Sequence, residues 1–127
     1  MNIYKVILVM VGGGLGAVSR YGVTLLTSRL YGSSFPWGTL CVNLSGCLLI
    51  GISFALADYK NVLSPSARLF IMTGFLGGLT TFSSYALESV NFARSGISSV
   101  SVINFIVNNV GGIALVLVGM WLVKSLL

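Results

Sequence analysis

Four apolar segments, each close to the length that a helix needs to cross a bilayer, constrain this chain more than any other feature. They run over residues 4–30, 38–56, 66–94 and 100–123, and about 20 apolar residues span the hydrocarbon layer. Only 7% of the residues are charged and 56% are hydrophobic, whereas a soluble domain has roughly 25% charged residues. We therefore expect an all-α integral membrane protein in which residues 1–127 form a single four-helix transmembrane domain.

The basic residues are distributed almost evenly between the two predicted sides of the membrane. Those on the side of the termini are Lys5, Lys60, Arg68 and Lys124, and those on the other side are Arg20, Arg29 and Arg94. Such a split gives almost no orientation signal under the positive-inside rule. A chain without this signal can insert both ways, which allows an antiparallel homodimer with its two-fold axis in the membrane plane. The basic residues are not clustered, so we expect no nucleic-acid binding.

Glycines and threonines interrupt the third apolar segment at residues 74–85, which read G-F-L-G-G-L-T-T-F-S-S-Y. Gly costs about 1 kcal/mol relative to Ala in a helix, and Thr can bond back to its own backbone. Backbone groups freed by a break in hydrocarbon must be satisfied by protein, water or an ion. We expect the third helix to be broken near its middle, where it lines a cavity or binds something. The alternative is that these small residues let two helices approach closely.

Amide side chains lie inside the second and fourth segments. Asn43 is in the second segment, and Asn104 and Asn108 are four residues apart in the fourth, with Asn109 beside them. Residues four apart share one face of a helix. A single Asn in a membrane is explained by an interhelical hydrogen bond of about 0.6–2 kcal/mol. A stacked pair together with Asn43 favours a polar track through the membrane.

Phe82 and Tyr85 follow the glycine-rich stretch and share one helix face. Packing against lipid or the protein core is the ordinary explanation for such a pair. However, the positive edge of an aromatic ring and a tyrosine hydroxyl can both face an anion, and Ser83 supplies a further hydroxyl donor. No acidic side chain lies near the centre of any segment, and a donor-rich path without carboxylates suits an anion. These residues favour a small-anion channel but do not distinguish fluoride from chloride or formate.

Two charged residues are expected near the ends of the helices. Arg20, near one end of the first helix, is either an anchor at the membrane surface or a positive charge that attracts anions to a pore mouth. Glu88, three residues after Tyr85, can pair with a basic residue at the mouth.

The main alternative from another class is a small proton-coupled multidrug exporter. That chemistry requires a membrane-embedded carboxylate, and the first two segments contain no Asp or Glu. A purely structural membrane subunit gives no reason for stacked amides beside a glycine-rich break. An enzyme is not expected, because the chain has no His and almost no carboxylates from which to build a nucleophile and its base.

The sequence resembles the Fluc (CrcB) family of fluoride channels across essentially its whole length. The matching stretches are G-G-G-L-G-A-V-S-R-Y at Gly12–Tyr21, G-T-L-C-V-N-L-S-G at Gly38–Gly46, G-F-L-G-G-L-T-T-F-S-S-Y at Gly74–Tyr85 and N-F-I-V-N at Asn104–Asn108. The resemblance implies an antiparallel dual-topology homodimer in the prokaryotic plasma or inner membrane, with two fluoride pathways along the subunit interface. It also implies passive export that relieves cytoplasmic fluoride toxicity.

The resemblance also assigns roles to individual residues. It implies a structural sodium ion on the two-fold axis, held by backbone carbonyls at positions that match Gly77 and Thr80. The other matching residues are Asn43, Phe82, Asn104 and Asn108 in the ion pathway and Arg20 at the aqueous vestibule. This sequence departs from the family where Tyr85 replaces the second pathway phenylalanine, and where Gly112 stands at a position at which many relatives have Ser.

Overall fold

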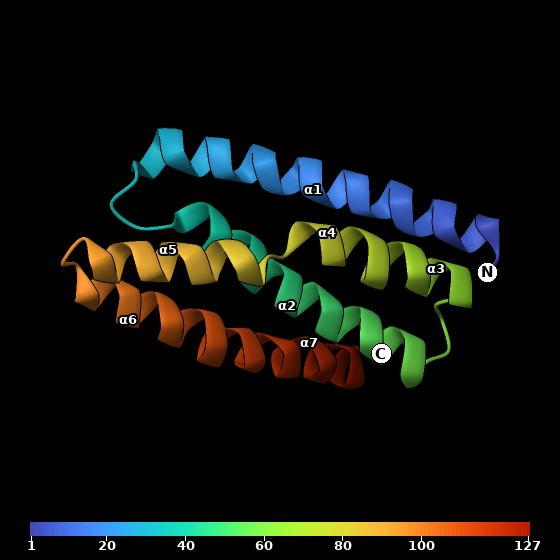
Figure 1. The fold of residues 1–127 in the computed structure, drawn as a ribbon. Coiled ribbons are helices and arrows are strands. Elements are labelled where there is room, and N and C mark those ends of the chain that lie inside the picture. The colour runs from blue at the N-terminus through green and yellow to red at the C-terminus, as the bar shows by residue number, and fades with distance from the viewer.

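The computed structural model describes all residues 1–127, and every element in it is helical. The helices form four long segments, which alternate in direction as Figure 1 shows. The first two segments are α1 (Ile3–Tyr31) and α2 (Trp37–Asp58). The third is made of α3 (Pro65–Arg68), η1 (Leu69–Leu76), α4 (Gly77–Leu79) and α5 (Phe82–Arg94). The fourth is made of α6 (Ser98–Ile106), η2 (Val107–Gly111) and α7 (Gly112–Leu126).

Short polar residues begin α1 and α3, and glycine ends α1. The side chain of Asn2 accepts a hydrogen bond from the Tyr4 N–H at the start of α1. Ser64 accepts from the Ala67 N–H at the start of α3, where Pro65 occupies the first helical position. Both residues replace backbone acceptors that the first turn of a helix lacks. Gly32 ends α1 with φ 73°, a backbone conformation that favours glycine.

The helices pack mainly against their neighbours, and α1 also packs against α2. α1 lies along η1 and α4, α2 packs mainly against α7, and α5 packs against α6. The largest buried apolar cluster is small: Val42, Leu76 and Leu79 form it, at the junction of α2 with η1 and α4. Most large apolar side chains therefore face outward.

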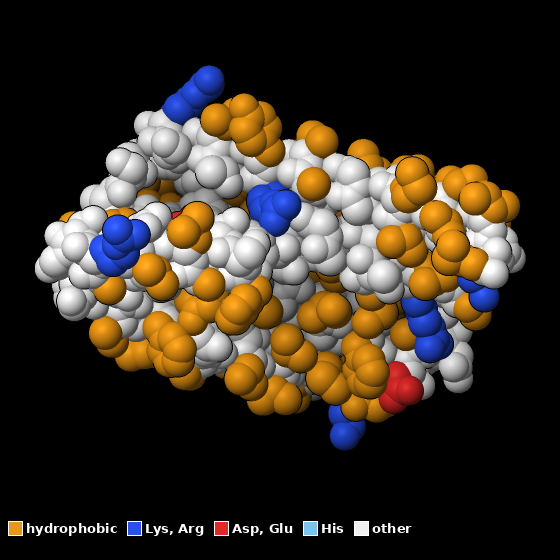
Figure 2. All heavy atoms as spheres, in the orientation of Figure 1, with side chains coloured by type: hydrophobic (Ala, Val, Ile, Leu, Met, Phe, Trp, Pro, Cys, Tyr) orange, Lys and Arg blue, Asp and Glu red, His pale blue; other side chains and the backbone are white.

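The outer surface has the character of a membrane protein. Hydrophobic side chains form broad patches along the lower edge and the right-hand part of the face seen in Figure 2, and the few charged side chains are scattered. Four helical segments are long and apolar enough to cross a membrane: Ile3–Tyr31, Trp37–Asp58, Pro65–Arg94 and Ser98–Leu126. The chain is a multi-pass, all-helical membrane protein.

Glycines allow α1 to approach the third segment at backbone distance. A Cβ atom at Gly16 would overlap the carbonyl oxygen of Phe75, and one at Gly78 would overlap the carbonyl oxygen of Gly13. Small residues at a helix interface permit this closeness in membranes, where dispersion contacts between helices contribute much of the packing energy. Gly78, within residues 74–85, thus lets two helices approach closely. This is the role that the alternative interpretation of this stretch gives to its small residues.

Two segments are π-helical rather than α-helical. η1 covers eight residues and η2 covers five, with η2 containing Asn108 and Asn109. The apolar pattern does not predict these wider turns, because a difference of less than one residue per turn is not visible over so few residues. π-Turns are rare and occur frequently at functional sites.

Candidate functional site

Two extended residues separate α4 from α5 in the middle of the third segment. Thr80 has φ −80° and ψ 154°, and Thr81 has φ −150° and ψ 113°. The side chain of Asn43, on α2, pairs with both backbone groups of Thr81: Oδ1 accepts from the Thr81 N–H at 2.7 Å, and Nδ2 donates to the Thr81 carbonyl at 3.1 Å. An amide side chain thus satisfies the backbone where the helix is interrupted, which is the condition for such an interruption inside a membrane.

The interruption leaves the carbonyl groups of four residues, Gly77, Gly78, Leu79 and Thr80, without their helical donors. In a continuous helix the Thr81 N–H would donate to the Gly77 carbonyl and the Ser84 N–H to the Thr80 carbonyl. Here the Thr81 N–H donates to Asn43, and the Ser84 N–H donates to the Thr81 hydroxyl at 3.2 Å. The carbonyl oxygens of Gly77 and Thr80 are therefore two of the four acceptors that the interruption makes available; Gly78 and Leu79 supply the others. Hard cations such as sodium bind oxygen ligands of this type.

A line of side-chain hydrogen bonds runs from the interruption into the fourth segment. Asn43 Nδ2 donates to Asn108 Oδ1 at 2.9 Å, and Asn108 Nδ2 donates to both Oδ1 and the carbonyl oxygen of Asn104 at 2.8 Å. Asn104 is fully buried, and its Nδ2 donates to Ser89 Oγ on α5 at 2.9 Å. We call this line, from Asn43 through Asn108 and Asn104 to Ser89, the amide relay. It brings Asn43, Asn104 and Asn108 together and adds Ser89.

Ser89 is the member of the relay that the sequence interpretation did not include. It lies four residues after Tyr85 and seven after Phe82, so all three are on one face of α5. That spacing was the signal available in the sequence. The Ser89 carbonyl oxygen also accepts from the Ser101 hydroxyl at 2.7 Å, which ties the end of the relay to α6.

The two aromatic residues after the interruption differ in exposure. Phe82 is 76% exposed and Tyr85 is 6% exposed. Their ring centroids are 5.3 Å apart at an interplanar angle of 65°, an edge-to-face arrangement in which one ring presents its positive edge to the other. The Phe82 ring is therefore the one that faces out of the subunit.

Asn109 fixes the orientation of the Tyr85 hydroxyl. Asn109 Nδ2 donates to the carbonyl oxygen of Phe105 at 2.8 Å and to Tyr85 Oη at 2.9 Å. Because a carbonyl only accepts, the atom that faces Phe105 must be the amide nitrogen, so Tyr85 Oη accepts from the same nitrogen. The hydroxyl hydrogen of Tyr85 is then free to donate elsewhere.

The part of these groups nearest the interruption lines an open cavity of about 330 Å³, whereas Asn104 and Ser89 lie outside its walls. Its walls include Asn43, Asn108 and Asn109, both aromatic rings, and the residues Gly77, Thr80 and Thr81 around the interruption. Ser83 is exposed beside it, with its hydroxyl 3.3 Å from that of Thr81. The cavity therefore combines amide, hydroxyl and aromatic-edge donors and contains no carboxylate.

The structure corrects the expectations for Arg20 and Glu88. Arg20 does not lie near a helix end, because α1 continues for eleven residues to Tyr31, and its half-buried side chain forms no hydrogen bond or ion pair. Glu88 does not pair with a basic residue. Its Oε1 accepts from the Thr39 hydroxyl at 2.7 Å, and its Oε2 is buried without a hydrogen-bond partner. Sequence spacing did not reveal the partner, because Thr39 lies on another helix.

Comparison of the sequence with known proteins shows the family of this chain. The family model described as CrcB-like protein, Camphor Resistance (CrcB), matches residues 7–120. The chain belongs to the CrcB family. Its CrcB relatives include a protein of Legionella pneumophila (strain Lens), 43% identical over 94% of this chain and 89% of the relative. Another, from Aeromonas salmonicida (strain A449), is 43% identical over 92% of this chain and 94% of the relative. Both are named fluoride-specific ion channel FluC.

The match to the CrcB family covers every residue of the cavity and the relay, since these lie between residues 43 and 109. A third relative, from Salinibacter ruber (strain DSM 13855 / M31), is 44% identical over 91% of this chain and has the same name. The similarity therefore extends across all four helical segments.

Proposed function

We propose that this CrcB chain is a subunit of a fluoride-selective channel that lets fluoride leave the cytoplasm passively and so protects against fluoride toxicity. The main support for the proposal is the amide relay, because it forms a continuous series of N–H donors between three membrane-spanning segments. The names of the relatives, which are fluoride-specific ion channels, supply the identity of the anion.

The ion pathway uses Asn43, Phe82, Ser83, Tyr85, Asn104 and Asn108. Each relay N–H already points at an amide or hydroxyl oxygen, and fluoride replaces these oxygens as the acceptor when it passes. Tyr85 donates its free hydroxyl hydrogen, and Phe82 presents its ring edge. Arg20 attracts the anion toward the vestibule from its position inside α1. Donors that are already oriented by the protein replace the hydration shell of the ion at little cost in reorganisation.

The complete channel is an antiparallel, dual-topology homodimer with a structural sodium ion on its two-fold axis. The carbonyl oxygens of Gly77 and Thr80, freed by the diverted N–H groups of Thr81 and Ser84, support this assignment. Two copies supply four such oxygens, and Na⁺ binds carbonyl oxygens of this kind. The interruption at Thr80 and Thr81 is then the functional break in the third helix.

The relatives with this name are bacterial, which supports a prokaryotic plasma or inner membrane as the location. No observation favours the multidrug exporter: the acidic residue inside a span, Glu88, accepts from Thr39 and lies outside the donor-lined cavity.

The test is fluoride efflux from liposomes that contain the purified protein, followed with a fluoride electrode, with chloride efflux measured in parallel. We expect rapid fluoride release without chloride release. Equal release of both ions would contradict selectivity and would first implicate Tyr85. Release of neither ion from a well-folded dimer would overturn the channel proposal.

A further inference from the structure

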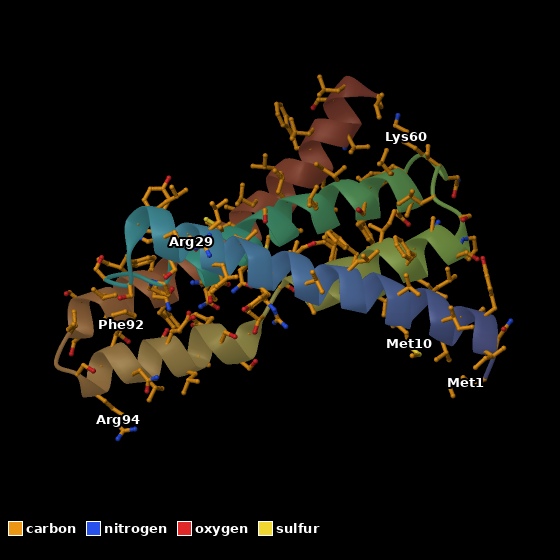
Figure 3. All side chains as sticks on the ribbon, turned by 90° about the horizontal axis from the view of Figure 1, so that it is seen from above. Met1, Met10, Arg29, Lys60, Phe92 and Arg94 are labelled. Carbon is orange, nitrogen blue, oxygen red and sulfur yellow. The ribbon has the colours of Figure 1, made fainter.

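Gly46, on α2, contacts the third segment at its interruption. It is buried, and together with Asn43 and Thr80 it lines the donor-lined cavity. A Cβ atom at Gly46 would overlap the methyl carbon of Thr80, the first of the two extended residues. Figure 3 places Lys60 at one end of the molecule and Arg94 at the other, and the join between α4 and α5 lies between them. The contact is therefore in the middle of the bundle.

The Thr80 side chain has little freedom to turn away from Gly46. Its hydroxyl donates to the Leu76 carbonyl oxygen at 2.9 Å, and this hydrogen bond fixes the χ1 angle of a β-branched residue that is already stiff. With χ1 fixed, the methyl group stays against α2. Another rotamer would take the hydroxyl from its acceptor inside a membrane protein, which is unfavourable. The backbone position of Thr80 therefore depends on the space that Gly46 leaves.

α2 holds the interruption at two neighbouring points. Asn43 pairs with both backbone groups of Thr81, and Gly46, three residues later, receives the methyl group of Thr80. The Thr80 carbonyl and the Thr81 N–H belong to one planar trans peptide group. Because the N–H donates to Asn43, the Thr80 carbonyl oxygen points away from Asn43. The position of this oxygen is thus determined by both contacts with α2.

We propose that Gly46 is a positioning residue for the Thr80 carbonyl oxygen, because it admits the Thr80 methyl group and so determines where this oxygen lies as a cation ligand. The inference rests on the proposed function, in which this carbonyl binds sodium. A methyl group at position 46 pushes the Thr80 peptide group away from α2 and displaces its oxygen.

The test compares Gly46→Ala with the double variant Gly46→Ala/Thr80→Ser, each as the full-length protein in detergent. Thr80→Ser removes the methyl group and keeps the hydroxyl that donates to Leu76. The measurement is the rise in the thermal unfolding midpoint when sodium chloride replaces N-methylglucamine chloride at constant ionic strength, since a cation that binds only the folded protein stabilises it. We expect Gly46→Ala to need about tenfold more sodium for the same rise. The double variant should respond within about twofold of Thr80→Ser alone.

Gly51→Ala is the matched control on the same helix. A Cβ at Gly51 would overlap the Val116 carbonyl oxygen on α7, so this change should lower the midpoint through a different contact. Its sodium response should stay unchanged, and Thr80→Ser should not restore its midpoint.

Two outcomes would overturn the role of Gly46 alone: an unchanged sodium response in Gly46→Ala, or no recovery of that response in the double variant. If Gly46→Ala does not fold, the double variant must recover both folding and the sodium response, and its failure to do so would also overturn the role. An original protein that sodium does not stabilise would contradict the sodium assignment in the proposed function, and this role with it.

Discussion

Asn43 connects the interrupted third segment to the fourth, and its amide geometry tolerates few changes. Asn43→Asp keeps the acceptor for the Thr81 N–H. It removes both donors and places a carboxylate oxygen against the Thr81 carbonyl and Asn108 Oδ1. Each buried acceptor left unpaired costs about 1–3 kcal/mol, and the added negative charge repels an anion. We expect fluoride efflux per dimer to fall at least about tenfold.

Ser45→Ala is the matched control for this change on the same helix. The Ser45 hydroxyl donates to carbonyls of its own helix, at Cys41 and Val42, so its loss should leave efflux within about twofold of the original. If Asn43→Asp transports fluoride as fast as Ser45→Ala, Asn43 is not in the pathway.

Tyr85 and Asn109 act as a unit in the proposed pathway. Asn109 donates to Tyr85 Oη and thereby leaves the hydroxyl hydrogen free to donate to an anion in the cavity that Tyr85 lines. We expect Tyr85→Phe and Asn109→Ala each to slow fluoride efflux by about two- to fivefold, since coupled contacts contribute about 0.5–3 kcal/mol. The double variant should be no slower than the slower single variant. Multiplied effects in the double variant would show that the two residues act independently.

At the scale of the helices, the close contact between α1 and the third segment depends on missing side chains. A Cβ at Gly16 would overlap the Phe75 carbonyl, whereas a Cβ at Gly14 meets nothing within 4 Å. Gly16→Ala should lower stability by about 1–3 kcal/mol, the range for overpacking. Gly14→Ala should leave stability unchanged or raise it by up to about 1 kcal/mol through helix propensity. Thermal unfolding in detergent compares the two, and equal midpoints would contradict the close approach.

Sequence patterns predicted the number and type of helices, because each span must be long and apolar whatever its neighbours are. They also drew attention to residues 74–85, where Thr80 and Thr81 are extended. Patterns did not predict η1 and η2, which differ too little from α-helix over so few residues. They did not reveal the Thr39 partner of Glu88 or the Asn109 partner of Tyr85. These pairs join residues that only the packing of different helices brings together.

At the scale of the whole molecule, the donor-lined cavity is open on one side and Phe82 is largely exposed beside it. An ion pathway must be shielded from lipid, because lipid cannot replace the hydration of an anion. A second copy of the chain can cover the opening and bring a second pair of Gly77 and Thr80 carbonyls. The geometry of one subunit is thus consistent with half of a channel.

Dual topology can be measured directly through the loops at the two ends of the bundle. Because Arg20 lies well inside α1, four basic residues lie near the terminal end (Lys5, Lys60, Arg68 and Lys124) and two near the other end (Arg29 and Arg94). A difference of two charges does not strongly select either orientation. In a protein whose two cysteines, Cys41 and Cys47, are replaced by alanine, Ser33→Cys places one thiol in the exposed loop between α1 and α2. A membrane-impermeant maleimide added to intact cells should label about half of these thiols, because random insertion places half of the loops outside. Asn61→Cys, in the exposed loop at the other end, should be labelled to the same extent. Complete labelling at one position and none at the other would establish a single orientation and exclude the antiparallel dimer.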